Sequence, residues 1–596
     1  MHLIDRLSLG LAWIAALLFF LTGVFLSYEV FARYLFNAPT TWVLETCELL
    51  LMWGVFLGLG RAVKLRENIS IELLFDRLSR GWQRLLDIVA LVFMAAFAAI
   101  VGWYAFSIAH ESFADGRTTA TVVDYPAWWA EASIVVGMAL LLLQCLVELV
   151  RALSGSDWDP ASVTATSTEA NPMSSALILL ALIGLLLIRI PVAYALGGLG
   201  LILLLAGGFS PLMAAQGILG TVDNFVLLSV PLFLLMSNIL LKGGVGRDLF
   251  AAVQAFVGHL PGGLGIATVL SCGIFAAISG SSVATAATIG TVAIPEMIER
   301  GYPKHFVYGL LAAGGTLGIL IPPSIPLIVY GFITEESILK LFLAGVGPGL
   351  LLMFLFAAFS MIYASRSTSY EPSPRASRAE RIRAGTRALP AIALAVLVIG
   401  VIYTGVATPT EAAAVGFAFA LLITAVLLRT LTWQGFKEAL VESMVTTVTI
   451  LMIVAGAKVF GKAITLYRIP QELSQLIADS FTTVGPFILV VAGVLILMGC
   501  FLEALSMMLI MVPVLAPALT PLGVDNVWFG VFFVIMIECA LITPPVGLNL
   551  YVIQAVGRAT LVDVSKGVWP FLALMLLSVV LIYFLPAIAL YIPFKL

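Results

Sequence analysis

Long apolar runs recur along the whole sequence and leave few possible folds. Runs of about twenty residues, the length that crosses a ~30 Å hydrocarbon core, stand at 9–30, 45–63, 85–109, 128–150, 389–405, 412–428 and 486–502. The runs are continuous rather than alternating, and isolated strands cannot satisfy their backbone groups in lipid. The sequence therefore predicts an all-α polytopic membrane protein that is surrounded by membrane lipid.

Composition supports a membrane protein and excludes several other classes. Only 11% of the residues are charged, against roughly 25% in an ordinary soluble domain. The cysteines and histidines are scattered singly, so neither a disulfide framework nor a metal site built from these residues is expected. The absence of a phosphate-binding P-loop motif disfavours an ATP-driven pump, and the net charge of −3 does not indicate a nucleic-acid partner.

Two polar segments interrupt the apolar pattern. Residues 154–173 are rich in Ser, Thr, Asp and Pro, which is typical of a linker. They separate a small part, residues 1–153 with about four spans, from a large part, residues 174–596. The second segment, residues 366–387, is rich in arginine and has no lysine. The positive-inside rule places it in the cytoplasm, and a disordered loop without another role is its simplest interpretation.

An internal repeat organises the large part. Adding 222 to a position in the first half reaches the same residue in the second for a series of prolines and glycines. The pairs are Pro295 and Pro517, Gly301 and Gly523, Pro322-Pro323 and Pro544-Pro545, Gly345 and Gly567, and Pro348 and Pro570. We therefore expect two homologous repeats, at about 215–365 and 437–590. Paired interruptions of this kind point to the binding site in transporter folds, and both inverted and parallel repeats are compatible with the spacing.

The first interruption is a run of small hydroxyl residues around a glycine, at 277–287. Gly280 lets the backbone turn, and hydroxyls together with freed carbonyls are the oxygen ligands that a hard cation requires. We interpret the run as a re-entrant helical hairpin with its tip at 279–282. A close helix–helix contact built on small residues is the alternative.

Adjacent prolines interrupt a later apolar segment in each half, at Pro322-Pro323 and Pro544-Pro545. Each pair removes two backbone donors and breaks its helix, and such backbone is tolerated in a membrane only where protein buries it or it lines a cavity. Half-helix N-termini attract an anion and freed carbonyls attract a cation. A kink for packing is the alternative at each site taken alone.

Two carboxylates lie within apolar segments of the second half, and such residues are candidates for function by default. Glu503 stands in the segment that duplicates the hydroxyl run. Glu538 stands in the next span, but the repeat pairs it with Thr316, so symmetry does not support a role for it.

The small part has a different character. A segment at 33–42 between its first two apolar runs, followed by two glutamates, suits an interfacial turn with charge pairing and an aromatic anchor. We expect a structural or subunit-contact role for Arg33, Asn37, Trp42, Glu45 and Glu48.

Several segments together resemble the tripartite ATP-independent periplasmic (TRAP) transporters. In the small part they are RYLFNAPTTWVLETCELL and ENISIELLFDRL, in which Asn68 stands where a histidine is common. In the large part they are SVPLFLLMSNILLKGG, AISGSSVATAATIG, LGILIPPSIPLIVYG, ATPTEAAAVG and ITPPVGLNLYV, in the family's order.

The resemblance implies a small (Q) and a large (M) membrane subunit fused into one multi-pass chain of the bacterial inner membrane. It implies a transporter, not an enzyme, with one fused chain per transport unit. The expected activity is sodium-coupled uptake of an organic acid by an elevator mechanism, after delivery by a periplasmic substrate-binding protein. The acid, whether a C4-dicarboxylate, a sugar acid or a sulfonate, is not specified.

The resemblance also assigns residues, with sodium as the coupling ion and the only metal. Sodium is expected at Ser279, Gly280, Ser281, Ser282, Pro323 and Ser324, and at Glu503, Ala504, Ser506, Thr543, Pro544, Gly547 and Asn549. The organic acid is expected at Ser281, Thr285, Thr288, Thr543 and Asn549.

One departure from the family leaves the topology open. Some fused members carry an extra spanning helix between the two parts, and residues 151–173 are too polar to supply it. Met173 begins a segment that looks like the natural start of a separate large subunit. Three explanations of the missing helix stay open. The short apolar segments on each side of Arg189 could complete the topology, one part could have the opposite sidedness, or two once-separate proteins could have been joined.

Two other functions compete with the TRAP interpretation. A sodium/dicarboxylate symporter without a binding protein also has paired hairpins, but the four-span small part argues against it. A membrane-embedded enzyme would need clustered His, Asp or Glu residues at acid–base or metal spacing, which the sequence does not contain.

Overall fold

The chain is almost entirely helical. The computed structural model describes residues 2–65, 80–119, 121–154, 175–366, 373–480, 483–499, 502–544 and 547–595. Within these ranges there is no β-strand, only an isolated bridge between Thr118 and Pro126. The prediction of an all-α protein is confirmed. The linker beyond Ser154 and the segment ENISIELLFDRL fall outside the described ranges.

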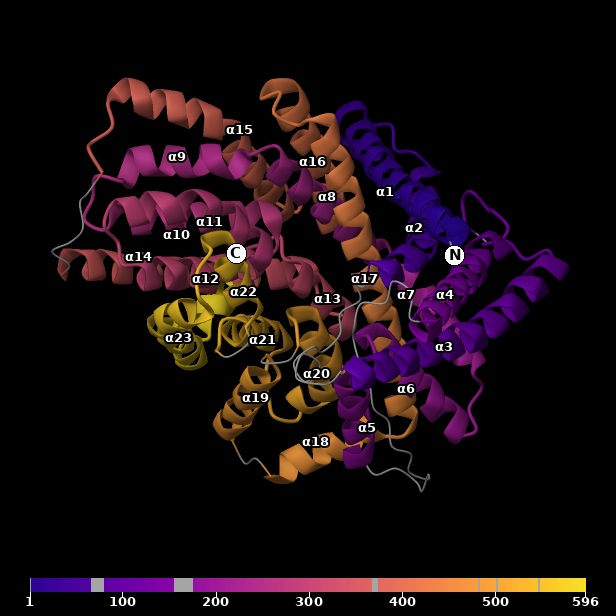
Figure 1. Cartoon of the computed structure of the whole chain (residues 1–596). Helices are drawn as coiled ribbons and strands as arrows, with labels where there is room; N and C mark the ends of the chain where they lie inside the picture. The colour runs from indigo at the N-terminus through magenta and orange to yellow at the C-terminus, as the bar shows by residue number, and fades with distance from the viewer. Residues whose placement is uncertain are drawn as a thin grey trace. The chain divides into compact units, whose positions relative to one another are not determined.

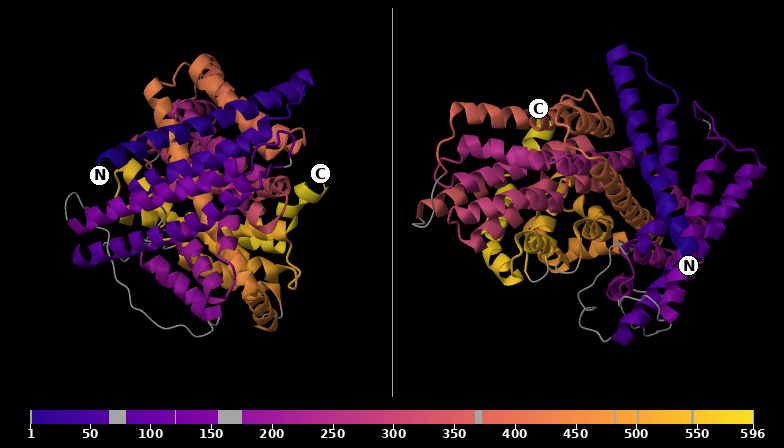
Figure 2. Two further views of the ribbon diagram at one scale, coloured as in Figure 1. Left: turned by 90° about the vertical axis from the view of Figure 1, so that its right-hand side faces the viewer. Right: turned by 45° about the horizontal axis from the view of Figure 1, so that its top comes forward.

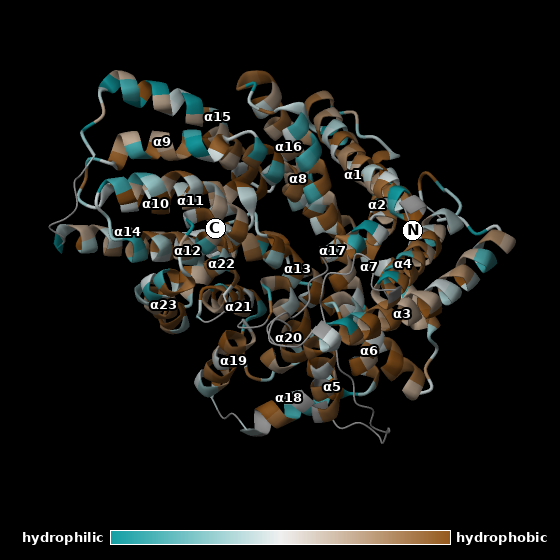
Figure 3. Ribbon diagram, in the orientation of Figure 1, coloured by the Kyte–Doolittle hydropathy of each residue, from teal (hydrophilic) through white to brown (hydrophobic). Residues whose placement is uncertain are grey.

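Ten helices in the described part of the chain are long and apolar enough to cross a membrane, or eleven with one bent pair. Apolar residues dominate most helices, as the brown ribbon of Figure 3 shows. Several large ones, such as Phe354 and Leu489, are mostly exposed, which is expected where the solvent is lipid. The polytopic prediction is confirmed, and residues 486–499 of the run 486–502 lie in α19 (Val484–Gly499).

The described chain folds into two compact units. Unit 1 comprises Met1–Pro231, Leu440–Thr482 and Leu509–Pro521, and unit 2 comprises Leu232–Ala439, Thr483–Met508 and Leu522–Leu596. The large part of the sequence thus contributes helices to both units.

Unit 1 contains the four spans of the small part. These are α1 (His2–Phe36), α2 (Val43–Lys64), α3 (Arg80–Ala114) and α4 (Trp128–Ser154). They are followed by α5 (Ser175–Leu187), α6 (Val192–Ala206), α7 (Leu212–Val222), the 3₁₀ helix η2 (Phe225–Leu228), most of α17 (Trp433–Leu466), and α18 (Ile469–Ser480). The α1–α2, α2–α4 and α3–α4 pairs pack together, and Figure 2 shows these indigo and violet helices from two sides.

Glycines let helices of unit 1 approach closely. A Cβ added at Gly456 of α17 would lie 2.1 Å from the backbone carbonyl oxygen of Ala193 in α6. A Cβ added at Gly200 would lie 2.8 Å from the backbone nitrogen of Phe460. Small residues at such contacts are typical of membrane helix packing.

Unit 2 contains the remaining helices. In chain order they are most of α8 (Ser229–Lys242), α9 (Val245–Val257), α10 (Gly263–Ser279), α11 (Ser282–Glu299), α12 (Lys304–Leu320), α13 (Ile325–Thr334), α14 (Ile338–Arg366), α15 (Arg378–Tyr403), α16 (Pro409–Leu421) and the π-helix η3 (Leu422–Leu427). After α17 they are α19 (Val484–Gly499), the start of α20 (Ala504–Leu519), α21 (Asn526–Leu541), α22 (Leu548–Gly557), α23 (Leu561–Phe584) and α24 (Ala587–Lys595). Helix α10 packs against α9, α11, α12 and α14 (Figure 1).

The two repeats run in opposite directions through unit 2. The 222-residue spacing pairs the start of α12 with the start of α21, because 304 plus 222 is 526. Yet the Tyr330 hydroxyl, near the end of α13, donates to the backbone carbonyl of Asn526 at the start of α21 (2.7 Å). Likewise Gly309 near the start of α12 contacts Gly567 near the start of α23. The repeats are therefore inverted, an arrangement known from secondary transporters.

Candidate substrate and cation site

The hydroxyl run of the first repeat forms a turn between two helices. Gly280 has φ of 60°, a left-handed conformation that favours glycine, and it ends α10. Ser281 caps α11, because its side-chain oxygen accepts a hydrogen bond from the backbone N–H of Ala284 (3.3 Å). The re-entrant hairpin that the sequence predicts is therefore present, in place of a continuous span.

Buried hydroxyls gather at this tip. The hydroxyl oxygens of Ser279 and Thr285 are 2.8 Å apart. Thr285 also donates to the backbone carbonyl of Ser281 (2.8 Å). Ser279, Ser282 and Thr285 are all buried. The tip thus concentrates oxygen atoms of the kind that hard cations bind.

The first proline pair breaks a helix beside the tip. Helix α12 ends at Leu320 and α13 begins at Ile325, and their axes differ by 42°. Ser324 caps α13 by accepting a hydrogen bond from the backbone N–H of Leu327 (3.4 Å). The break is therefore built like the hairpin tip, with a serine at the start of a new helix.

The tip and the break touch through two glycines. A Cβ added at Gly280 would lie 2.7 Å from the carbonyl oxygen of Pro323. A Cβ added at Gly318 in α12 would lie 2.4 Å from the carbonyl oxygen of Ser281. The N-termini of α11 and α13, the positive ends of two half-helices, consequently lie side by side.

The second hairpin has a carboxylate where the first has a serine. Glu503 precedes α20, which begins at Ala504, and accepts hydrogen bonds from the backbone N–H (3.1 Å) and the hydroxyl (3.2 Å) of Ser506. Gly499 at the end of α19 packs directly on Ala540 of α21. Residues 500 and 501 fall outside the described ranges. Glu503 therefore acts locally as a helix cap, as Ser281 does.

The second break lies between α21 and α22. Thr543 donates its hydroxyl to the backbone carbonyl of Cys539 (2.7 Å), and Pro544 follows it. Gly547 precedes α22, and Asn549 is wholly buried, with no hydrogen-bond partner for either amide atom among the described residues. Helix α22 packs against α11 and α12 of the first repeat. Asn549 thus brings an unsatisfied buried amide to the helices that form the first half of the site.

Glu538 is the residue whose position the sequence alone undervalues. It lies in the last turn of α21, is 1% exposed, and neither carboxylate oxygen has a hydrogen-bond partner among the described residues. Its side chain lies beside the hydroxyl of Ser282 at the hairpin tip. The repeat partner, Thr316, instead donates to the backbone carbonyl of Ala313 (2.6 Å). Only the rule that intramembrane carboxylates are functional candidates could have found Glu538.

The structure thus brings most of the predicted site residues of the first repeat together. Ser279, Gly280, Ser281, Ser282 and Thr285 at the tip are in one cluster with Pro323 and Ser324 of the break. Thr288 lies about two turns further along α11, and its buried hydroxyl has no hydrogen-bond partner within the described ranges.

The turn predicted in the small part is held by a residue that the sequence pattern did not single out. Arg33 pairs with Glu29, one turn earlier in α1 (2.6 Å). Glu29 also accepts a hydrogen bond from the backbone N–H of Thr40 (2.9 Å). Asn37 makes the turn with a positive φ of 50°.

The other predicted residues of the small part have separate contacts. The Trp42 ring meets that of Phe25 edge-on, with centroids 5.5 Å apart. Glu45 accepts hydrogen bonds from the Thr121 hydroxyl (2.6 Å) and the Val122 backbone N–H (3.0 Å), so it anchors the loop between α3 and α4. Glu48 lies in α2, about one turn after Glu45 along the chain.

Family models cover almost the whole chain. Residues 179–588 match the DctM component of the tripartite ATP-independent periplasmic transporters, and residues 11–155 match the DctQ component. The two matches fall on either side of the polar linker.

Individual relatives of this chain are also TRAP transporter permeases. An isethionate TRAP transporter permease DctMQ of Oleidesulfovibrio alaskensis is 32% identical over 93% of this chain and 89% of its own length. The large permease protein DctM of a C4-dicarboxylate TRAP transporter of Pseudomonas aeruginosa is 39% identical over 63% of this chain and 87% of its own length. The large permease protein SiaM of a sialic acid TRAP transporter of Vibrio cholerae is 35% identical over 69% of this chain and 96% of its own length.

These relatives are transporter permeases, so a multi-pass transporter of the bacterial inner membrane, and not an enzyme, is confirmed. The chain belongs to the TRAP transporter family, and it carries a DctQ-type small component and a DctM-type large component in a single polypeptide.

Proposed function

We propose that this chain is the membrane part of a sodium-coupled uptake system for a small organic acid that a periplasmic substrate-binding protein delivers. The relatives are named for isethionate, C4-dicarboxylates and sialic acid. These three compounds share an anionic sulfonate or carboxylate group. The proposed substrate is therefore a small carboxylate or sulfonate, and one fused chain forms one transport unit.

The contact between the first hairpin tip and the first helix break is the observation that carries this proposal. There the N-termini of α11 and α13 meet, each capped only by a serine side chain. Two positive helix ends favour a bound anion. In this proposal the acid group of the substrate binds beside Ser281 and Thr285.

Unsatisfied buried groups support a cation at the same place. A carboxylate inside a membrane protein is costly unless a counter-charge or hydrogen-bond donors offset its desolvation. Among the described residues no donor reaches Glu538 with hydrogen-bond geometry, although the Ser282 hydroxyl lies next to it. Sodium held by the tip hydroxyls, backbone carbonyls and Glu538 would neutralise this charge.

The two binding events are coupled in this account. Sodium draws the oxygens of Ser279, Ser281 and Ser282 together and so fixes the direction in which the N-terminus of α11 points. The ordered tip then binds the acid. The second repeat does the same with Glu503, Ser506, Thr543 and Asn549, and the inverted repeats alternate access by an elevator movement.

Uptake by proteoliposomes that contain the full chain tests the proposal. Radiolabelled succinate, isethionate and sialic acid are offered with and without a sodium gradient, and with and without the cognate soluble binding protein. Uptake of one acid that needs both sodium and the binding protein is the expected result. Uptake with sodium alone would favour a direct sodium/dicarboxylate symporter, and uptake that ignores sodium would overturn the coupling.

A further inference from the structure

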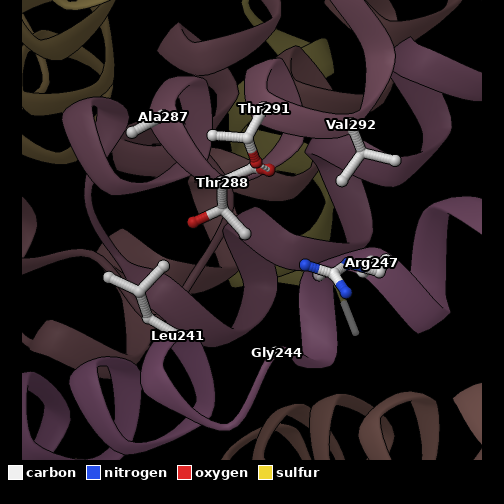
Figure 4. Close-up of a pocket in the computed structure, with 8 residues that line it drawn as sticks. Leu241, Gly244, Arg247, Ala287, Thr288, Thr291 and Val292 are labelled. Atoms are coloured by element: carbon white, nitrogen blue, oxygen red, sulfur yellow. Dashed lines mark hydrogen bonds between the residues drawn. The ribbon is translucent and has the colours of Figure 1, made fainter. Parts of the chain in front are cut away.

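A cavity of about 220 Å³ lies next to α11, away from the hairpin tip. Its lining comes from the turn between α8 and α9 and from one face of α11, and includes Arg247, Thr288 and Thr291. Figure 4 shows the Arg247 side chain extending from the start of α9 toward these threonines. This volume corresponds to about seven water molecules. A small organic acid would therefore fit in the cavity.

Arg247 is exposed and brings to this cavity a positive charge that has no ion partner among the described residues. It forms no ion pair or hydrogen bond with another described residue through its guanidinium. The neighbouring Asp248 in the first turn of α9 does not pair with it. An arginine presents several N–H donors in a planar arrangement that matches carboxylate and sulfonate oxygens.

Thr288 provides a second, independent sign of a ligand. The residue is 8% exposed, and its hydroxyl has no hydrogen-bond partner in the described part of the chain. A buried polar group without a partner costs roughly 1–3 kcal/mol. Thr291 differs, because its hydroxyl already donates to the backbone carbonyl of Thr288 (2.8 Å). Thr288 therefore brings a buried hydroxyl without a partner to the wall of the cavity.

The start of α9 adds backbone donors. Gly244 precedes the helix with φ of 72°, and no side chain caps the first turn. Gly246 in this turn touches Thr288 so closely that an added Cβ would lie 2.2 Å from the threonine methyl carbon. The helix N-terminus, Arg247 and Thr288 thus border one small space.

The hairpin geometry places the cavity on the cytoplasmic side of the tip. Gly262, just before α10, packs on Met361 near the end of α14. Helix α14 leads into the arginine-rich segment 366–387, which is cytoplasmic by the positive-inside rule. Thr288 lies six residues from Ser282, or roughly 9 Å along α11. An acid leaving the tip for the cytoplasm would pass this level.

We propose that this cavity is a second anion site, in which Arg247 and Thr288 bind the carboxylate or sulfonate of the transported acid on its way to the cytoplasm. The identity of the ligand as the transported acid rests on the proposed function. A cytosolic inorganic anion offers the same chemistry, so the test separates the two sources.

Protection of a cysteine at the cavity tests the site directly. Thr291→Cys is introduced into the full-length chain with its five native cysteines replaced, and its reaction with a neutral maleimide is followed in detergent. Succinate, isethionate, sulfate and chloride are compared at equal ionic strength, without sodium or binding protein. Succinate or isethionate should slow labelling where chloride does not.

Variants in the same background show whether Arg247 is responsible. Arg247→Gln should raise the half-protecting concentration about tenfold or more, because hydrogen bonds to charged groups contribute about 1.5–3 kcal/mol. Arg247→Lys should restore part of the protection. Gly246→Ala should weaken protection by displacing Thr288 without changing charge. Arg383→Gln, at an exposed arginine of α15, is the matched control and should leave protection unchanged.

Each other outcome overturns the proposal. Protection by sulfate alone would assign the cavity to an inorganic anion, and no protection, or equal protection in Arg247→Gln, would remove the site. Because labelling needs neither sodium nor uptake, protection together with failed sodium-coupled uptake would refute the proposed function and leave the anion site standing.

Discussion

At the scale of single residues, Gly318 determines how closely the broken helix meets the hairpin tip. A Cβ at this position would lie 2.4 Å from the Ser281 carbonyl and 2.7 Å from the Thr285 hydroxyl. Both atoms belong to a buried, hydrogen-bonded turn, so they cannot move aside as a flexible side chain would.

Gly318→Ala should therefore destabilise the protein by about 1–3 kcal/mol, the usual cost of overpacking, and should slow uptake. Thermal unfolding of the purified chain measures the first effect. Gly400→Ala in α15 is the control, because an added Cβ there meets nothing within 4 Å. Equal melting temperatures for the two variants would contradict the close contact.

Glu538→Gln keeps the shape of the buried side chain and removes its charge. If the carboxylate is the counter-charge for sodium, the sodium concentration for half-maximal uptake should rise about tenfold or more. Glu411→Gln is a matched control, because Glu411 is also buried but accepts a hydrogen bond from the backbone N–H of Thr408. An unchanged sodium requirement in Glu538→Gln would remove Glu538 from the site.

The sequence could predict the tip residues but not the importance of Glu538 or Arg247. Glycine and adjacent prolines restrict the backbone of their own segment, so Gly280 and Pro322-Pro323 identify a turn and a break locally. The proposed role of Glu538 depends on its neighbour Ser282, and that of Arg247 depends on Thr288. Only the folded chain brings these residues together.

At the scale of elements, the turn between α1 and α2 depends on one buried carboxylate. Glu29 is fully buried and accepts hydrogen bonds from the Arg33 guanidinium and the Thr40 backbone N–H. The Arg33 side chain is about one-third exposed, so water still solvates part of its guanidinium when Glu29 is removed.

Glu29→Ala should lower the stability of the purified protein by about 1.5–3 kcal/mol, the range for hydrogen bonds to charged groups. Glu111→Ala is the control: its contact with Arg117 is 3.9 Å long and both side chains are exposed, so it should cost about 0–1 kcal/mol. Comparable losses in the two variants, measured by thermal unfolding, would argue against this role of Glu29.

Element boundaries illustrate where hydropathy is insufficient. Helix α10 is apolar, but it ends at Ser279, where Gly280 turns the chain into α11. A hairpin arm and a spanning helix meet the same apolar environment, so their hydropathy is alike. Only the length before a turn distinguishes them, and here a glycine rather than a proline makes the turn.

At the scale of the whole molecule, the repeat spacing was visible in the sequence but its direction was not. Prolines and glycines recur at a fixed offset whichever way a helix crosses the membrane. The contacts between Tyr330 and Asn526 and between Gly309 and Gly567 establish the inversion.

Together with the positive-inside rule for the segment 366–387, the helix directions predict the sidedness of the large part. A single Arg375→Cys, in the arginine-rich segment, should react with a membrane-impermeant maleimide only from the cytoplasm. Ser337→Cys, before α14 at the opposite end of that helix, should react only from the periplasm. Both positions are exposed. Labelling of both from one side of intact cells and inverted vesicles would contradict the topology.

The central claim is that sodium binds at the tips and breaks of the inverted repeats. Its most direct test is thermal unfolding of the full chain as sodium replaces potassium at constant ionic strength, because a ligand that binds only the folded state stabilises it in proportion to RT ln(1 + [L]/Kd).

Ser281→Ala and Thr543→Ala are compared with the wild type. Loss of the Ser281 cap lowers stability by about 0.5–2 kcal/mol in either salt, so the sodium response is the decisive quantity. The account predicts stabilisation by sodium but not by potassium, with a higher half-maximal sodium concentration in both variants. An identical sodium response in the wild type and both variants would contradict it.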